Sequence, residues 1–258
     1  MMDNWQIICR LSVLFFGDNH MSEIQTGVIS PIECMKQGWE LIKNDFWIFF
    51  AITLVGMILG GVTMYILLGA MMCGVFYCYL QKIDGKSVSF DDLWKGFQWW
   101  VPGLIAVIIM VVPMFFIMGF IYAPFIAAAV MGSKLSESEL IGLLLGAFAI
   151  DLVAIVLMVC FHTLLMFTFP LIVDRNLSAF EAMKMSAKGV WKNLGGIAGF
   201  YGVAFVLGLA GTLACGVGTY FVIPIIMGGT VVAYRKIFPR RDTFGQPPSP
   251  GYYQGFQG

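Results

Sequence analysis

The stretch DRNLSAFEAMKMSAKGVWKN, residues 174–193, is the longest polar segment between apolar runs, and it decides our interpretation of the fold. Ser178 and Glu181 are spaced as a capping box, which predicts that a helix begins there. Apolar side chains recur at helical spacing behind this start: Phe180, Met183, Ala187 and Val190, with Trp191 beside them. A second face carries Glu181, Lys184, Lys188 and Lys192. An apolar stripe with an indole and a lysine ladder predicts a helix lying flat on a bilayer surface; a solvated linker helix is the alternative.

The same pattern occurs twice more, beginning at Ser30 and at Ser89. The copy that begins at Ser30 and the copy that begins at Ser178 have the same residue at four positions, all at one offset: Ser30/Ser178, Glu33/Glu181, Met35/Met183 and Lys36/Lys184. Each copy is followed by enough apolar sequence for two membrane crossings. The sequence therefore predicts an internal repeat of three units, each an amphipathic surface helix followed by a transmembrane hairpin. Shared interfacial chemistry without duplication is the alternative.

The composition indicates a membrane protein. Of the 258 residues, 59% are hydrophobic and 12% are charged, whereas a soluble domain carries about a quarter charged residues. The six cysteines are scattered through apolar runs with no C-x-x-C spacing, so we expect buried thiols and no disulfide framework. The chain has only two histidines and contains no P-loop, G-x-S-x-G or H-E-x-x-H motif. We therefore expect no catalytic residue, no cofactor-binding residue and no metal site, hence no enzyme.

The apolar runs predict an all-α polytopic membrane protein with six transmembrane helices arranged as three hairpins, each preceded by a cytoplasmic amphipathic helix. The expected spans are residues 46–61, 63–81, 101–122, 140–169, 194–212 and 217–237. The uncharged run 46–80 is too long for one crossing of a roughly 30 Å core, so we place a break near Gly60 and Gly61. Pro113 and Pro124 suggest that the third span ends near Tyr122. Pro170 marks the expected end of the overlong fourth span.

The positive charges predict the orientation. With these spans, 14 of the 15 lysines and arginines fall on one side and only Lys134 falls on the other. The positive-inside rule then places both termini and all three surface helices in the cytoplasm of a bacterium, with the protein in its cytoplasmic (inner) membrane.

The two ends of the chain are expected to lie outside the membrane domain, residues 30–238. Residues 1–29 are an N-terminal leader, and Met21 looks like a natural start, so residues 1–20 are either a start-codon artefact or an interfacial segment. Residues 239–258 are rich in proline, glycine, glutamine and tyrosine, which predicts a disordered cytoplasmic tail. Its Pro247–Pro250 run is a candidate ligand for protein partners, although a plain solvated tail is the simpler interpretation.

Asp151 and His162 are the candidate intramembrane polar site. A carboxylate inside a span costs at least about 2.5–3.5 kcal/mol, so it pairs, stays protonated or faces a cavity. His162 lies 11 residues later at nearly the same helical angle, but about 16 Å away along the axis. The two side chains would line one path for a proton or cation. The alternative is that tilt of the overlong helix brings Asp151 near water and that His162 is an interior imidazole.

The candidate lipid-headgroup contacts lie on the surface helices: Lys184, Lys188, Lys192, Trp191, Lys36 and Trp39. Helices that lie on a bilayer meet lipid phosphates before nucleic acid. We therefore expect their partners to be membrane lipids, above all anionic ones, and not nucleic acid.

The run FPLIVDR, residues 169–175, together with Ser178–Asn193 and the glycine-rich segments that follow, resembles a group of bacterial six-span membrane proteins of unknown function. These are similar to the membrane domain of glycerophosphodiester phosphodiesterases. The segment from Gly74 to Phe97 resembles them too, and the likeness covers roughly residues 27–238. It implies a fold and a membrane but no catalytic residue, because the soluble phosphodiesterase domain has no counterpart here. We expect a non-enzymatic membrane scaffold or accessory protein; the alternative is a small transporter or channel that uses Asp151.

Overall fold

The computed structural model describes residues 24–131, 136–213 and 216–240, and within these residues the chain is helical without strands. The all-α prediction is therefore confirmed. Five helical segments are long and apolar enough to cross a membrane, as expected of a multi-pass membrane protein. They are Pro31–Val62, Phe90–Val130, Glu137–Arg175, Leu194–Leu213 and Gly218–Ile237. The proposed leader up to residue 23, Lys134 and the tail from residue 241 lie outside the described residues.

The helices follow one another with short connections. In chain order they are α2 (Pro31–Ile42), η2 (Lys43–Asp45), α3 (Phe46–Val62), α4 (Leu68–Ile83), η3 (Phe90–Trp99), α5 (Trp100–Met131), α6 (Glu137–Leu164), α7 (Thr168–Arg175), α8 (Ala179–Lys192), α9 (Leu194–Leu213) and α10 (Gly218–Ile237). The pairs α3/α4, α5/α6 and α9/α10 each pack against each other.

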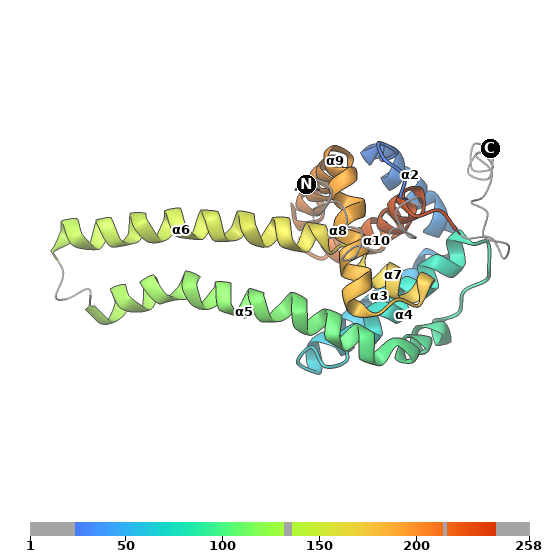
Figure 1. Cartoon of the computed structure of the whole chain (residues 1–258), viewed down its shortest axis with the longest axis horizontal. Coiled ribbons are helices and arrows are strands. Elements are labelled where there is room, and N and C mark those ends of the chain that lie inside the picture. Colours follow the sequence, from blue (N-terminus) through green and yellow to red (C-terminus); the bar gives the residue numbers. More distant parts are fainter. Residues whose placement is uncertain (1–23, 132–135, 214–215, 241–258) are drawn as a thin grey trace, which may run out of the picture.

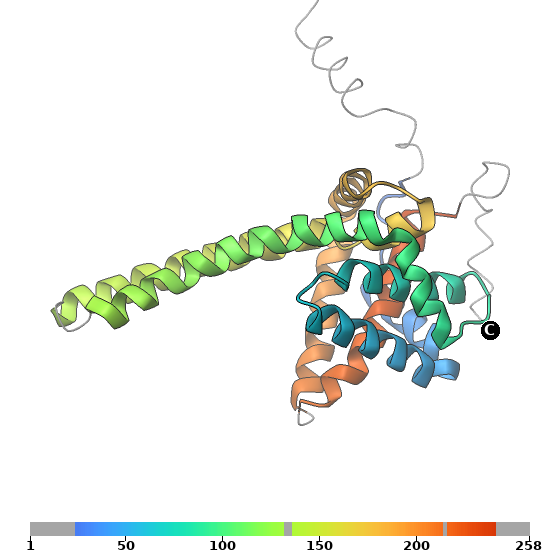
Figure 2. The same ribbon diagram turned by 90° about the horizontal axis from the view of Figure 1, so that it is seen from below.

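The molecule consists of a long arm and a packed body. Helices α5 and α6 lie side by side and form the arm, which projects from the body formed by the other helices (Figures 1 and 2). With 32 and 28 residues, the two arm helices are about 48 Å and 42 Å long, so each exceeds a hydrocarbon core of roughly 30 Å. Their outer surface is apolar, with large exposed side chains such as Phe116, Phe120 and Phe148.

α5 does not end where the sequence analysis placed the end of the third span. It continues through Pro113 and Pro124 to Met131 instead of stopping near Tyr122. A proline removes one intrahelical hydrogen bond and bends a helix, but long membrane helices tolerate it where local adjustment of the backbone or a neighbouring helix satisfies the freed carbonyl.

α6 ends earlier than predicted, at Leu164 rather than near Phe169. The Ser186 hydroxyl of α8 donates to the Leu164 carbonyl at 2.7 Å and accepts from the Phe167 N–H at 3.1 Å. These bonds satisfy the backbone at the break. Pro170 then lies in the first turn of α7, where its missing N–H costs little. The break thus depends on a contact with a helix further along the chain.

The break between α3 and α4 lies close to its predicted position. α3 ends at Val62, just after Gly60 and Gly61, and residues 63–67 turn the chain with left-handed backbone at Met64 and Tyr65. α4 has only 16 residues, fewer than the roughly 20 that a typical span needs.

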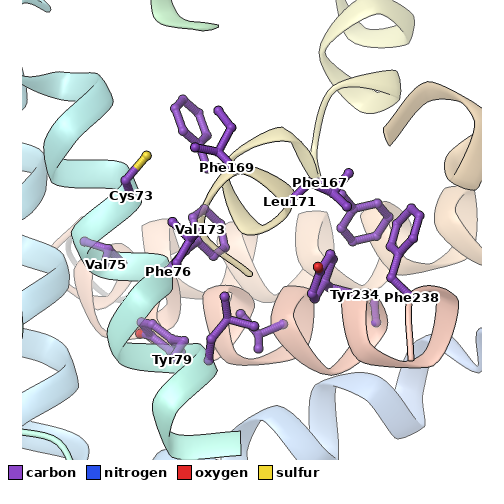
Figure 3. Close-up of a cluster of buried hydrophobic side chains, with 14 of the residues drawn as sticks. Cys73, Val75, Phe76, Tyr79, Phe167, Phe169, Leu171, Val173, Tyr234 and Phe238 are labelled. Carbon is purple, nitrogen blue, oxygen red and sulfur yellow. The ribbon is translucent and has the colours of Figure 1, made fainter. Parts of the chain in front are cut away.

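α4 forms the centre of the body. Its Phe76 and Tyr79 face the segment around α7 on one side and α10 on the other, where Tyr234 and Phe238 complete a buried cluster (Figure 3). The Tyr79 hydroxyl donates to the Pro224 carbonyl of α10 at 3.2 Å and lies 3.0 Å from the Thr53 hydroxyl of α3. One buried phenol therefore connects three helices.

The three polar segments are integral parts of the body. α2 packs against α10 so closely that a Cβ on Gly38 would lie 2.3 Å from the Gly229 nitrogen. η3 packs against α4 in the same way, since a Cβ on Gly96 would lie 2.1 Å from the Ala70 carbonyl oxygen. α8 contacts α6 and α7 through Ser186. Thus η3 and α8 pack against helices that precede them, whereas α2 packs against α10, the last described helix.

The first and third polar segments bury the same positions. At the offset that pairs Ser30 with Ser178, five pairs are buried in both: Cys34/Ala182, Met35/Met183, Gly38/Ser186, Leu41/Gly189 and Ile42/Val190. This is the pattern that an internal repeat produces, although the repeat itself stays a prediction.

Candidate functional site

The most unusual site in the body is a buried ion cluster where α4, α7 and α10 end. Asp84 follows the last residue of α4, Asp174 lies near the end of α7, and Arg235 lies near the end of α10. Arg235 Nη1 lies 2.7 Å from Asp174 Oδ2, and Nη2 lies 3.1 Å from Asp84 Oδ2. One guanidinium therefore bridges two carboxylates from separate helices, which suits its planar fork of donors.

The cluster is strongly protected from solvent. Arg235 is 2% exposed, and Asp174 Oδ2 also accepts a hydrogen bond from the Tyr234 hydroxyl at 2.7 Å. Burial raises the pKa of Asp84 above its usual value, against the lowering effect of the Arg235 and Arg240 charges. Charges held out of water are stable only when each has a partner, so the three helix ends depend on one another.

A cavity of about 340 Å³ opens beside the cluster. Its lining consists of Asp84, Asp174, Arg175 and Arg240. Arg175 is held in place by stacking on the Phe238 ring, 5.6 Å from its centroid, and by donating to the Pro239 carbonyl at 3.4 Å. Arg240 Nη1 lies 3.7 Å from Asp84 Oδ1, which is a loose ion pair. Both signs of charge therefore face one small space.

α8 has the predicted start, but protein covers only part of its predicted apolar stripe. The Ser178–Glu181 capping box is present, and Met183 and Val190 are buried. Phe180 and Trp191, however, are 62% and 71% exposed. The buried face consists mainly of small residues, Ala179, Ala182, Ser186 and Gly189, because α8 packs closely against protein, where large rings do not fit. The predicted apolar stripe is therefore divided, with Met183 and Val190 on the buried side of α8 and Phe180 on the exposed side.

The outward face of α8 combines aromatic and basic side chains. Phe180, Lys184, Lys188 and Trp191 follow helical spacing along one side. Lys184 and Lys192 are exposed, and Lys188 is half-buried. An aromatic–basic face of this kind is typical of helices at a membrane–water interface.

The first polar segment presents a similar outer face. Lys36 is exposed, and Trp39 and Ile32 are 41% and 62% exposed. The prediction had placed Ile32 and Trp39 on the same apolar face as Met35 and Ile42, but only the latter two are buried. Here too the inward face packs against a glycine pair, so the large side chains point outward.

Asp151 and His162 lie 11 residues apart along one helix. Both lie on α6, and the Nδ1 atom of His162 lies 3.0 Å from the Met158 carbonyl of its own helix, as expected of an interior imidazole. Asp151 is half-buried in the arm, and its Oδ1 atom has no hydrogen-bond partner among the described residues. The neighbouring groove, about 470 Å³ and lined by Ile150, Val153 and other apolar side chains, provides no polar path.

Replacing Asp151 by leucine should therefore stabilise the protein. The change removes a partly buried carboxyl from an apolar arm, so we expect a gain of about 1–3 kcal/mol in the free energy of unfolding. Thermal unfolding of the full chain in detergent measures it, with the exposed Glu137→Leu as a control that gives no such gain. A loss of stability in Asp151→Leu would show that the carboxyl has a partner.

The ion cluster was not predicted from the sequence. Arg235 was only one of the positive charges that set the orientation, and Asp84 and Asp174 had no predicted role. A signal was present, because Asp174 directly follows an apolar run, Asp84 lies four residues after the uncharged run 46–80, and Arg235 follows an apolar run in α10. That the three groups meet is a property of the packing.

Comparison with known proteins does not extend this description. No family model, no curated protein and no solved structure matches the chain.

Proposed function

We propose that the protein is a non-enzymatic scaffold of the bacterial inner membrane that gathers anionic lipids at its cytoplasmic face. The observation that carries this proposal is the outward face of α8, where Phe180 and Trp191 flank lysines while the opposite face is fixed to the body. A rigidly mounted aromatic–basic face can hold lipid headgroups at one place beside the protein.

The proposed topology has six spans as three hairpins, α3/α4, α5/α6 and α9/α10, with both termini in the cytoplasm. In this arrangement α2, η3 and α8 lie at the same interface. The exposed Trp39, Trp94 and Trp191 belong to these three segments, in keeping with an aromatic belt at one membrane surface. Supporting this arrangement, the ends of α4, α7 and α10 meet in the ion cluster, so they lie at one level.

Native mass spectrometry of the full chain with phosphatidylglycerol and phosphatidylcholine tests the proposal. We expect preferential binding of phosphatidylglycerol and a loss of roughly fivefold in Lys184→Gln, because one lysine near an anionic surface contributes about 1 kcal/mol. Lys86→Gln is the matched control, since Lys86 is exposed but lies outside α2, η3 and α8.

Trp191→Ala should weaken the same lipid binding, because the indole leaves the interface. Equal binding of the two lipids, or equal losses in Lys184→Gln and Lys86→Gln, would contradict the proposed role of α8.

A further inference from the structure

The charged cavity beside the ion cluster differs in its lining from two grooves on the arm. Two grooves on the arm, beside Phe116 and Ile150, have mostly apolar linings and face outward. The cavity at the helix ends is bounded by two carboxylates and two guanidiniums. Its volume of about 340 Å³ lies within the range of small-molecule sites, roughly 300–1,000 Å³.

The two signs of charge come from different places. Asp84 and Asp174 form the inner side, because both contact the buried Arg235. Within the described residues, Asp174 receives its hydrogen bonds from Tyr234 and Arg235 on Oδ2. This leaves its Oδ1 atom as an acceptor for an incoming ligand. Asp84 bonds to Arg235 through both oxygens and retains lone pairs on each, since a carboxylate offers about four acceptor sites.

The guanidiniums form the other side. Arg175 is positioned by the Phe238 ring and the Pro239 carbonyl. Arg240 has 41% of its side chain exposed and only a 3.7 Å contact with Asp84, so it can turn toward a ligand at little cost. Two guanidiniums approaching from different elements suit a tetrahedral anion, whose several oxygens can each accept a charge-assisted hydrogen bond.

We propose that this cavity binds a compound that carries both a phosphate group and a primary amine. The phosphate would contact Arg175 and Arg240, and the ammonium group would contact Asp84 and Asp174. The five charged groups, including Arg235, sum to one positive charge. A phosphate monoester with an ammonium group, which carries close to one net negative charge at neutral pH, balances this charge.

This chemistry has two sources. One is a soluble phosphoamine, and the other is the headgroup of an aminophospholipid in the adjoining leaflet, whose phosphodiester carries one negative charge. The proposal concerns different residues from the lipid-binding face of α8, so either can fail without the other.

Isothermal titration calorimetry of the full chain in maltoside detergent tests the site with three probes: O-phosphoethanolamine, inorganic phosphate and ethanolamine. We expect O-phosphoethanolamine to bind at least about tenfold more tightly than either fragment, because it engages both sides of the cavity. Native mass spectrometry with phosphatidylethanolamine and phosphatidylglycerol identifies the source. Preference for phosphatidylethanolamine over both phosphatidylglycerol and the soluble probe assigns the site to a lipid headgroup, and preference for the soluble probe assigns it to a soluble ligand.

Arg240→Gln is the informative variant, since the side chain is at the rim and outside the buried cluster. We expect it to weaken binding of O-phosphoethanolamine by about tenfold, through loss of one charged hydrogen bond, while the melting temperature is retained. Arg240→Lys should recover part of the affinity, because it restores the positive charge at the rim. The proposal is overturned if phosphate binds as tightly as O-phosphoethanolamine, if Arg240→Gln binds normally, or if neither the soluble probe nor phosphatidylethanolamine binds.

Discussion

Replacement of Arg235 by methionine should destabilise the protein by about 3–5 kcal/mol. The change leaves the carboxylates of Asp84 and Asp174 in a buried site without the guanidinium that both contact at 3.1 Å or less. Removing one partner of a buried ion pair costs far more than the pair contributes, because the remaining charges have lost both water and their counter-ion. Thermal and denaturant unfolding of the full chain in detergent measures the loss.

Two further variants separate this effect from simple loss of an arginine. Arg240→Met changes the charge equally, but its side chain is 41% exposed, so the cost should stay below about 1 kcal/mol. Combining Arg235→Met with Asp84→Asn and Asp174→Asn removes the unpaired charges and should recover much of the stability. If the Arg235→Met protein were as stable as the unmodified chain, the ion cluster would not contribute to the free energy of unfolding.

Replacement of Gly38 by leucine should disrupt the contact between α2 and α10. Even a single Cβ at this position would lie 2.3 Å from the Gly229 nitrogen and 2.7 Å from its Cα, and backbone atoms cannot move aside as a side-chain end can. Gly38→Ala should cost about 1–3 kcal/mol, as overpacking of a tight interior typically does, and Gly38→Leu should cost more. Melting temperatures of the two variants test the order.

Gly202→Ala is the matched control, because a Cβ on Gly202 in α9 meets nothing within 4 Å. Alanine favours a helix over glycine by about 1 kcal/mol, so this change should be neutral or stabilising. If Gly38→Ala and Gly202→Ala had the same effect on the melting temperature, α2 and α10 would have to lie further apart at Gly38 than the 2.3 Å distance indicates.

Local patterns predicted several helix starts and turns. The capping box at Ser178 and the turn after Gly61 are both present, because their causes lie within a few residues of one another, whereas Ser30 makes no side-chain capping bond. The end of α6 at Leu164 could not be predicted in this way, since it depends on the Ser186 hydroxyl of another helix. Hydrophobic runs alone likewise could not show that α5 continues through its two prolines.

The packed face of α8 could not be predicted from the sequence either. Periodicity identifies an apolar stripe, but it does not show which face packs against protein, and here that face contains small residues such as Gly189 and Ser186 while Phe180 and Trp191 are exposed. The ion cluster was missed because residues far apart in the chain form it, and only the folded arrangement brings Asp84, Asp174 and Arg235 together.

The contact between α2 and α10 also has a consequence for synthesis. The glycine pair that receives Gly38 is translated roughly 190 residues later, which at about 5–20 residues per second is a delay of roughly 10–40 s. During that time α2 lacks the helix that it packs against most extensively, and a chain cut short before α10 never gains it. Cellular proteases would thus find α2 less protected in incomplete copies, whereas finished copies pack it against α10.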